Sequence, residues 1–208
     1  VSRFPPMAKT FESFVPKIRE FIEKQKMFFV ATAPRTDTGH VNVSPKGIQG
    51  TFAILDDRTI AYLDFTGSGV ETIAHIRENG RICVMFCAYE GPPRIVRVHG
   101  TGDAIEPGDP EFDTLVTHFD DFPIVRSIIR IRASRISDSC GYGVPLYDYK
   151  GERDQLQRWA ERKGADGVAE YQRDNNTQSL DGLPSGLGNH QHGDARDPNA
   201  AGGRAPDE

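Results

Sequence analysis

The sequence predicts a mainly β fold with flanking helices, built as a small antiparallel barrel of six or seven strands. Short apolar segments of β type follow one another closely between residues 28 and 134, and few segments have helical periodicity. Turn residues such as Asp37–Gly39 and Asp56–Arg58 separate neighbouring segments. Closing such short strands into a barrel removes exposed sheet edges, so closure is the expected arrangement.

The elements follow in order along the chain. Residues 11–26 repeat apolar side chains at helical spacing, which predicts a first amphipathic helix. Further helices are expected at residues 70–79 and 110–119, the latter because Asp109–Pro110 is a good helix start. Closely spaced strands should pair antiparallel as a meander. The expected strands are Phe28–Ala33, His40–Pro45, Thr51–Leu55, Thr59–Asp64, Ile82–Ala88, Arg94–Thr101 and Ser127–Ser134.

The 208 residues indicate one domain with an appendage. We assign residues 1–149 to the barrel domain and residues 150–174 to a helical extension, in which a charged helix at 151–163 carries one large apolar anchor, Trp159. Residues 175–208 form a polar tail rich in Gly and Pro, which has too little apolar pattern to fold alone. We expect this tail to be disordered or to lie on a partner's surface.

Charge and composition exclude several classes of function. The net charge of −5 argues against a nucleic-acid or anionic-membrane partner. No apolar run reaches the roughly 18 residues that span a bilayer. Three cysteines, an odd number, and an N-terminal stretch without an apolar signal core predict a cytoplasmic protein. No HExxH or paired CxxC motif is present, and we interpret the pair of His190 and His192 in the tail as incidental, so we expect no metal site.

The most informative stretch is residues 59–86, which predicts a strand, a glycine turn, a helix and a second strand. Gly67, Ser68 and Gly69 open onto the helix start, where backbone N–H groups can hold a phosphate. Glu71 and Thr72 occupy the first turn of that helix. The Gly-Ser-Gly triplet matches neither a Walker nor a Rossmann glycine pattern, so other residues must define the site.

The segment HVNVSPKG, residues 40–47, is a second candidate for phosphate chemistry. On a strand, Asn42 and Ser44 share one face while Val41 and Val43 share the other. Lys46 follows at the strand end, and a lysine with a hydroxyl at such a place can bind phosphate. The alternative is a solvated sheet edge with an exposed lysine.

The segment RIVRVHGTG, residues 94–102, places Arg97 and His99 on one strand face, opposite Val96 and Val98. Such a face could line a site, and the alternative is a solvated sheet face. We expect Cys83 and Cys87 to be small buried residues, because four residues of strand separate them by about 13 Å.

Taken in order, these pieces resemble the pyridoxamine 5'-phosphate oxidase-like family of flavin-binding split β-barrels. The resemblance rests on KMFFVATAP, GHVNVSPKG, YLDFTGSGVETIAHIRENGRICVMF and RIVRVHGTG, which together cover about residues 11–102. It implies a split barrel that forms a homodimer, with FMN at the subunit interface and residues from both subunits around it.

The resemblance also implies where the flavin lies. Lys46 and Ser68 would hold the phosphate, Ser44 and Asp64 would lie near the ribityl chain or the ring edge, and Thr72 would close the site. The full set of expected cofactor-binding residues is Asn42, Ser44, Lys46, Leu63, Asp64, Gly67, Ser68, Gly69, Glu71, Thr72 and Arg97.

The chain departs from the oxidase that gives the family its name. That oxidase carries an Arg-Lys pair where Glu71 and Thr72 stand here, and its C-terminal Trp and Arg motif is not found. We therefore expect an FMN-dependent oxidoreductase whose small-molecule substrate is not pyridoxamine phosphate, with no assignable general acid or base. The alternatives are a non-catalytic protein that stores or senses a flavin, deazaflavin or haem, and a structural dimer module.

Overall fold

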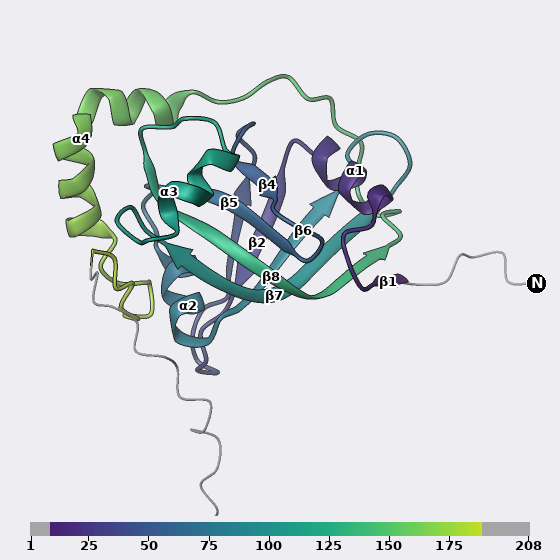
Figure 1. The fold of residues 1–208 in the computed structure, drawn as a ribbon, viewed down its shortest axis with the longest axis horizontal. Helices are drawn as coiled ribbons and strands as arrows, with labels where there is room; N and C mark the ends of the chain where they lie inside the picture. The colour runs from purple at the N-terminus through teal and green to yellow at the C-terminus, as the bar shows by residue number, and fades with distance from the viewer. Residues whose placement is uncertain (1–8, 189–208) are drawn as a thin grey trace, which may run out of the picture.

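The computed structural model describes residues 9–188, which form one curved antiparallel sheet with helices packed around it (Figure 1). The strands are β1 (Lys9–Phe11), β2 (Phe28–Thr32), β3 (Asn42–Lys46), β4 (Phe52–Ile54), β5 (Thr59–Phe65), β6 (Arg81–Cys87), β7 (Ile95–Ile105) and β8 (Val125–Ser139). The helices are α1 (Pro16–Lys24), α2 (Glu71–Asn79), α3 (Phe112–Leu115), the 3-10 turn η1 (Val116–His118) and α4 (Gln155–Asn175).

The sheet confirms the predicted antiparallel, mainly β fold, but the strands do not form one meander. Their order is β3-β2-β6-β7-β8-β5-β4, and β1 pairs separately with β8. The hairpins β2–β3 and β4–β5 and the run β6–β7–β8 join neighbours in sequence, as expected. The prediction is wrong where β5 pairs with β8 and β6 pairs with β2. Between β5 and β6 the chain passes through α2, which packs on β2, β6 and β7 and so carries it across the sheet.

The first helix is shorter than its periodicity predicts. It starts at Pro16, because proline lacks the N–H that a helix interior needs and suits the first turn. Residues 9–11 instead form β1, which pairs with β8. Ile18 and Ile22 of α1 are fully buried and pack into the main core.

Other elements differ from the sequence prediction mainly in their ends. Strand β8 runs from residue 125 to 139 and α3 is only one turn long. Helix α4 begins later and ends later than predicted, and it kinks at Gly164, whose φ of 69° is left-handed. Gly80, with a φ of 73° and a ψ of −8°, ends α2 in the left-handed helical conformation and allows β6 to start directly.

The main core lies on the inner face of the sheet, where alternate strand residues meet α1 and α2. Phe28 is its aromatic centre, with ring centroids 5.2 Å from Phe52, 5.6 Å from Tyr62 and 5.5 Å from Phe86. These rings come from β2, β4, β5 and β6, so the contact joins both halves of the strand path. Because β3 pairs with β2, this core fixes the end of β3 relative to the end of β5. The site described below lies at these two strand ends.

The outer face of β2 and β6 is also largely apolar, while β7 adds Ile95 together with Arg97 and His99. Phe29 lies opposite Met85, and Ala31 lies opposite Cys83, in the β2–β6 register. These four side chains are only partly buried, as is Ile95 on β7. An antiparallel sheet usually places polar residues on a solvated face, so this apolar face is unusual.

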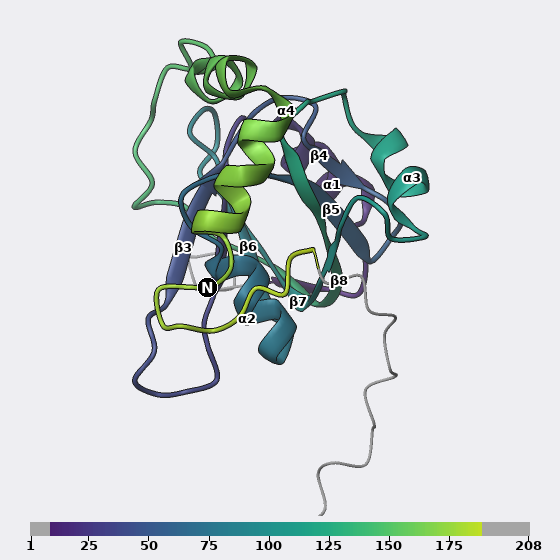
Figure 2. The same cartoon turned by 90° about the vertical axis from the view of Figure 1, so that its left-hand side faces the viewer.

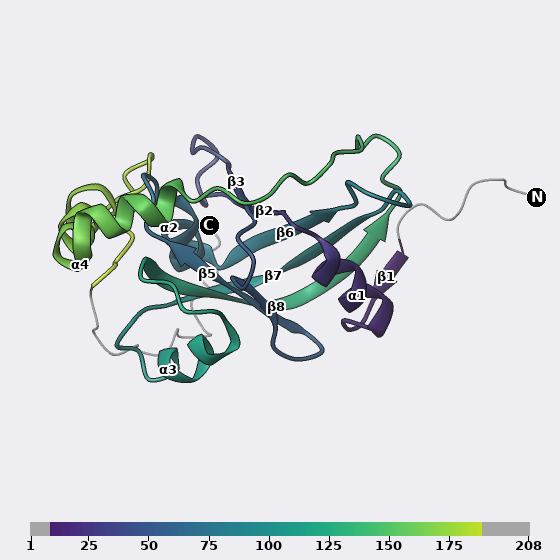
Figure 3. The ribbon, with the colours of Figure 1, turned by 90° about the horizontal axis from the view of Figure 1, so that it is seen from above.

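The C-terminal part of the chain wraps around the barrel. A long connection leaves β8, runs along the barrel and reaches α4 at the end opposite β1 (Figures 1 and 3). Residues 176–188 then turn back beneath α4 and pass close to α2 (Figure 2). The expectation of disorder is wrong for this segment, because polar contacts tie it to its own barrel and Ser185 is fully buried. The other expectation, contact with a partner's surface, stays a prediction. Residues 189–208, the remainder of the predicted tail, lie outside the described residues.

Candidate flavin site

A pocket of about 290 Å³ opens where the end of β3, the end of β5 and the start of α2 come together. It contains the Gly-Ser-Gly loop, and its lining includes most of the predicted cofactor residues. Those that line it are Ser44, Lys46, Asp64, Gly67, Ser68, Gly69, Glu71 and Thr72. The strand–loop–helix unit and the HVNVSPKG strand, separate in sequence, thus form one site.

Three predicted residues do not line this pocket. Asn42 lies behind it, with its side-chain amide donating to Thr72 Oγ1 at 3.0 Å. Leu63 is buried in a second apolar cluster with Ile105 and Ile128. Arg97 projects from the outer sheet face, where its guanidinium donates to Ser139 Oγ at 3.1 Å.

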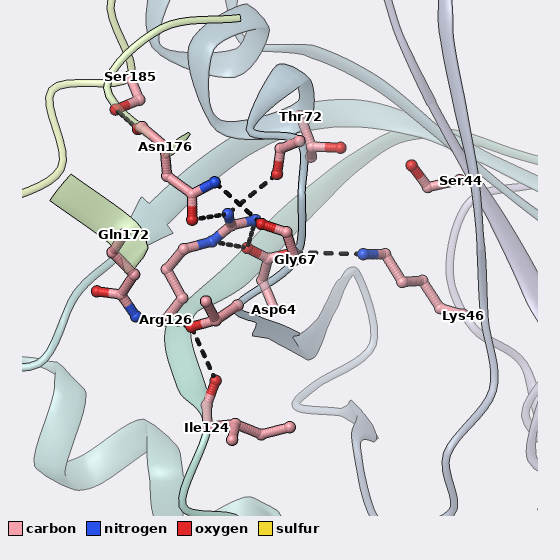
Figure 4. Close-up of polar contacts among 12 residues, drawn as sticks. Ser44, Lys46, Asp64, Gly67, Thr72, Ile124, Arg126, Gln172, Asn176 and Ser185 are labelled. Carbon is pink, nitrogen blue, oxygen red and sulfur yellow. Dashed lines mark hydrogen bonds and ion pairs between the residues drawn. The ribbon is translucent and has the colours of Figure 1, made fainter. Parts of the chain in front are cut away.

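Asp64 is the centre of the charges in the pocket (Figure 4). Its Oδ2 accepts from Arg126 Nη2 at 2.7 Å and from Nε at 2.9 Å. Its Oδ1 accepts from Lys46 Nζ at 3.3 Å. Both Asp64 and Arg126 are buried, with side-chain exposures of 2% and 4%. Because the Asp64 carboxylate bonds to both cations, it fixes the positions of the Lys46 and Arg126 side chains.

Burial alone would raise the pKa of the Asp64 carboxyl, because a low-dielectric site disfavours its charged form. The charges of Arg126 and Lys46 outweigh that effect and hold the pKa below its usual value. Asp64 is therefore ionised at neutral pH. In this state it accepts hydrogen bonds and does not serve as a proton donor.

Arg126 is the residue that sequence reasoning missed. In the β5–β8 ladder Asp64 pairs with Ser127 while Phe65 pairs with Val125, so Arg126 is an extra residue in β8. This β-bulge disturbs the alternation of side chains along the strand and re-aims the arginine toward Asp64. The expected strand began two residues too late, at Ser127, and so left Arg126 out. A strict alternation would not have shown a bulge.

The glycine loop is held from behind by the C-terminal part of the chain. Asn176 is fully buried; its Nδ2 donates to Gly67 O at 3.0 Å and its Oδ1 accepts from Arg126 Nη1 at 2.8 Å. Arg126 Nη1 also donates to Gly69 O at 3.0 Å. Gln172, one turn earlier, donates to Thr66 Oγ1 at 2.6 Å. Loop, arginine and C-terminal segment therefore form one network (Figure 4).

Glu71 brings negative charge to the same loop. Its carboxylate lies so close to Gly69 that a Cβ there would collide with it. The backbone N–H of Leu180 donates to its Oε1 at 3.2 Å. The C-terminal segment therefore binds the glycine loop region twice, through Leu180 at Glu71 and through Asn176 at Gly67.

Thr72 offers a hydrogen-bond donor to the pocket. Asn42 Nδ2 donates to both Thr72 Oγ1 and Thr32 Oγ1, at 3.0 and 3.2 Å. The Thr72 oxygen is therefore an acceptor for Asn42, which leaves its proton for an acceptor in the pocket. Thr32 Oγ1 also lies 3.0 Å from Nδ1 of the fully buried His75. Burial lowers the pKa of His75, so the imidazole is neutral there.

The residues of this pocket fit a phosphate-bearing ligand. Lys46 supplies a cation, and Thr72 supplies a hydroxyl donor. Helix α2 has no side-chain cap at its first residue, so its N-terminal N–H groups are available to an anion. The lining carries two cations and the two carboxylates of Asp64 and Glu71, so its formal charge is balanced.

The family described as pyridoxamine 5'-phosphate oxidase matches residues 14–140 of this chain. The chain belongs to this family. A member from Aspergillus flavus, the pyridoxamine 5'-phosphate oxidase family protein ustO, is 40% identical over 190 residues, covering 84% of this chain and 76% of the relative.

Solved structures of similar fold include HupZ of Group A Streptococcus, 23% identical with a TM-score of 0.44, covering 58% of this chain and 89% of that chain. Another is a protein from Clostridium acetobutylicum related to general stress protein 26 of B. subtilis, from the pyridoxinephosphate oxidase family. It is 14% identical with a TM-score of 0.48, and the match covers 69% of this chain and 96% of that chain.

Proposed function

We propose that this chain binds FMN in the 290 Å³ pocket and is a flavin-dependent oxidoreductase. One observation carries the proposal: Lys46 and Arg126 converge on Asp64 directly beside the glycine loop and the uncapped start of α2. This combination of a cation, backbone donors and a helix N-terminus is suited to a phosphate monoester. Membership of the pyridoxamine 5'-phosphate oxidase family agrees with a flavin phosphate in that position.

Each residue of the pocket has a distinct part in this proposal. Lys46 and the backbone around Ser68 would hold the phosphate, and Thr72 would donate its hydroxyl proton to it. Ser44 and Asp64 would face the ribityl chain. Arg126 is fully engaged with Asp64, Gly69 and Asn176, so its part is to position the loop and Asp64.

The bound flavin would supply the redox chemistry, by accepting and donating a hydride or single electrons. The chain supplies binding and orientation, together with an ionised carboxylate at a fixed place. The substrate is proposed to be a small molecule other than pyridoxamine phosphate, because Glu71 stands where the named oxidase has a cation.

We further propose that the chain forms a homodimer with the flavin at the subunit interface. The partly exposed apolar face that contains Phe29, Ala31, Met85 and Ile95 supports this, because a second copy would cover it. The lining of the pocket has no net formal charge to balance that of a phosphate, so a cation from the second copy would supply the missing positive charge. Sedimentation should give a dimer, and Met85→Glu should give a monomer. A monomer for the unchanged chain would contradict the dimer.

The test of the cofactor is the visible spectrum of the purified protein. We expect flavin absorbance at about 450 nm, either in the protein as purified or after dialysis against FMN. Lys46→Ala should weaken FMN binding about tenfold, because it removes a charge-assisted contact. Lys24→Ala is the matched control, since the ion pair of that lysine within residues 9–188 is with Glu20, on the surface. A protein that stays colourless with FMN, or an unchanged affinity in Lys46→Ala, would overturn the assignment.

A second candidate is a protein that stores or senses its cofactor without catalysis. It is favoured by the fact that each titratable side chain lining the pocket already has a partner among residues 9–188. Such a pocket offers no free acid or base for proton transfer. Bleaching of the flavin colour by NADPH, followed by reoxidation by a substrate, would favour the enzyme. If no reductant reduces the bound flavin at a rate typical of an enzyme, the non-catalytic binding protein is favoured.

A further inference from the structure

A second cavity, a groove of about 1210 Å³, shares Lys46 with the small pocket. Its walls are α1 and the residues after it, the end of β3, the loop between β6 and β7, and the segment 147–156, which ends in the first turn of α4. We call that segment the strap. Figures 1 and 3 show the strap running along the barrel past α1.

The strap is fixed to the barrel on both sides of the groove. Tyr147 N donates to Tyr89 O at 3.0 Å, and the two rings stack with centroids 5.5 Å apart and an angle of 27° between their planes. Further along, Glu152 Oε1 accepts from Gln49 N at 2.7 Å. The groove is therefore a formed feature of the molecule.

The aromatic side chains of the strap are nevertheless exposed. Tyr147 is 61% exposed and Tyr149 is 46% exposed. Held tyrosines with open ring faces offer a large contact area at a low cost in conformational entropy. They are suited to stacking on a planar ligand.

The groove is also positively charged, although the chain as a whole carries −5. Seven Lys or Arg residues line it, against four Asp or Glu residues. Two of those carboxylates, Glu20 and Asp148, pair with lysines of the groove itself. Lys17, Lys26 and Arg153 form no ion pair within residues 9–188. The ammonium of Lys26 lies 5.8 Å from the ring centre of Tyr149, so one cation and one aromatic face lie together.

We propose that this groove binds a planar aromatic molecule that carries an anionic group. The ring stacks on Tyr147 and Tyr149, and the anion pairs with Lys26 and Lys17. Because Lys46 borders both cavities, a ligand in the groove lies next to the proposed flavin. That this ligand is the redox substrate rests on the proposed function, whereas its binding does not.

The test uses the full-length protein and three simple probes in calorimetry. 1-Naphthyl phosphate has both features, 1-naphthol has only the ring, and glycerol phosphate has only the anion. We expect naphthyl phosphate to bind at least tenfold more tightly than either partial probe, with and without saturating FMN. Tyr149→Leu and Lys26→Gln should each weaken it about tenfold and leave FMN affinity unchanged.

Each control variant makes the same type of substitution, one tyrosine to leucine or one lysine to glutamine, at a position outside the groove lining. Tyr142→Leu removes an exposed tyrosine that precedes the strap and lies outside the groove lining. Lys163→Gln removes an exposed lysine of α4 that also lies outside the lining. Both should bind naphthyl phosphate like the unchanged protein.

Three outcomes would overturn the proposal. Glycerol phosphate could bind as tightly as naphthyl phosphate, which would show charge attraction alone. The Tyr149 and Lys26 variants could bind like the controls. The same variants could turn a dimer into a monomer while the probe fails to bind, which would make the groove an interface between copies. Since the probe is tested without FMN, failure of the flavin assignment gives a separate result.

Discussion

The small pocket and the groove meet at Lys46, yet they hold their charges in opposite ways. In the pocket, Asp64 and Arg126 are buried and bonded to each other and to the backbone. In the groove, Lys17 and Lys26 lie beside aromatic rings and have no carboxylate partner within the described range 9–188. A buried ion pair fixes the geometry of its residues, and removing one partner destabilises the fold because the other charge stays buried and unpaired. Solvent-accessible cations without a carboxylate partner can instead attract an anionic ligand. The pocket is therefore expected to respond to mutation through folding, and the groove through binding.

The largest effect should come from Arg126→Met, which leaves the Asp64 carboxylate buried without its guanidinium partner. We expect a loss of about 3–5 kcal/mol in the free energy of unfolding, measured in urea. Arg126→Met combined with Asp64→Asn should recover part of that loss, because no fully buried charge is then left unpaired; Lys46 loses its partner too, but its side chain is 26% exposed and can be solvated. A loss below about 1 kcal/mol for the single variant would show that the pair does not organise the pocket.

Asn176→Ala should have the next largest effect. It removes one donor and one acceptor from the network that joins Gly67 to Arg126, and we expect a loss of about 1–3 kcal/mol. FMN should also bind less tightly, because the glycine loop loses a support. The neighbouring Asn175→Ala is the control, since Asn175 is exposed and, among the residues that the structure describes, its side chain donates to Tyr171 O within its own helix. Equal effects of the two variants would contradict the role given to Asn176.

A smaller effect, of opposite sign, is expected for Glu71→Gln. The amide keeps an acceptor for Leu180 N but removes a negative charge beside the proposed phosphate. FMN affinity should rise several-fold, by a free energy of about 1 kcal/mol or less. Titration of FMN by its fluorescence quenching measures this. A lower affinity would mean that the Glu71 charge supports the loop more than it repels the ligand.

The smallest effect concerns pH. Burial lowers the pKa of His75 in the folded protein, so below about pH 6.5 the unfolded chain takes up a proton that the folded chain does not. Stability should therefore fall as the pH drops from about 6.5 toward the folded pKa, with a slope of at most about 1.4 kcal/mol per pH unit from this group.

His75→Gln should flatten that pH dependence, while His118→Gln, which changes an exposed histidine, should not. Urea unfolding at a series of pH values between about 5 and 8 measures both. An unchanged slope in His75→Gln would show that other groups cause the loss of stability.

The sequence predicted those parts of the fold that follow a simple period. Alternation placed Asn42 and Ser44 on one face of the strand and Val41 and Val43 on the other, and the structure shows that the two valines are exposed. Closely spaced strands indicated antiparallel pairing, and the strand–loop–helix unit was located correctly. The order of strands was not predictable, because the contacts that set it, such as that between Phe28 and Phe52, join distant parts of the chain.

The site was only partly predictable, for related reasons. Lys46 and the glycine loop carry local signals that can be read from the sequence. Arg126 enters through a bulge, which breaks the alternation that a strand prediction assumes. Asn176 acts through single polar contacts in a segment without apolar period, and such contacts leave no pattern in a sequence. Composition alone therefore suggested disorder where the structure has a buried network.

The position of Asn176 so late in the chain has a consequence for how the protein is made. Synthesis delivers every strand of the sheet before it delivers the asparagine that ties Gly67 to Arg126. The barrel can thus form on the ribosome while the glycine loop of its pocket still lacks the support of Asn176. Capture of the cofactor would then be a late event in biogenesis, and a yellow colour would report that translation had passed the final helix.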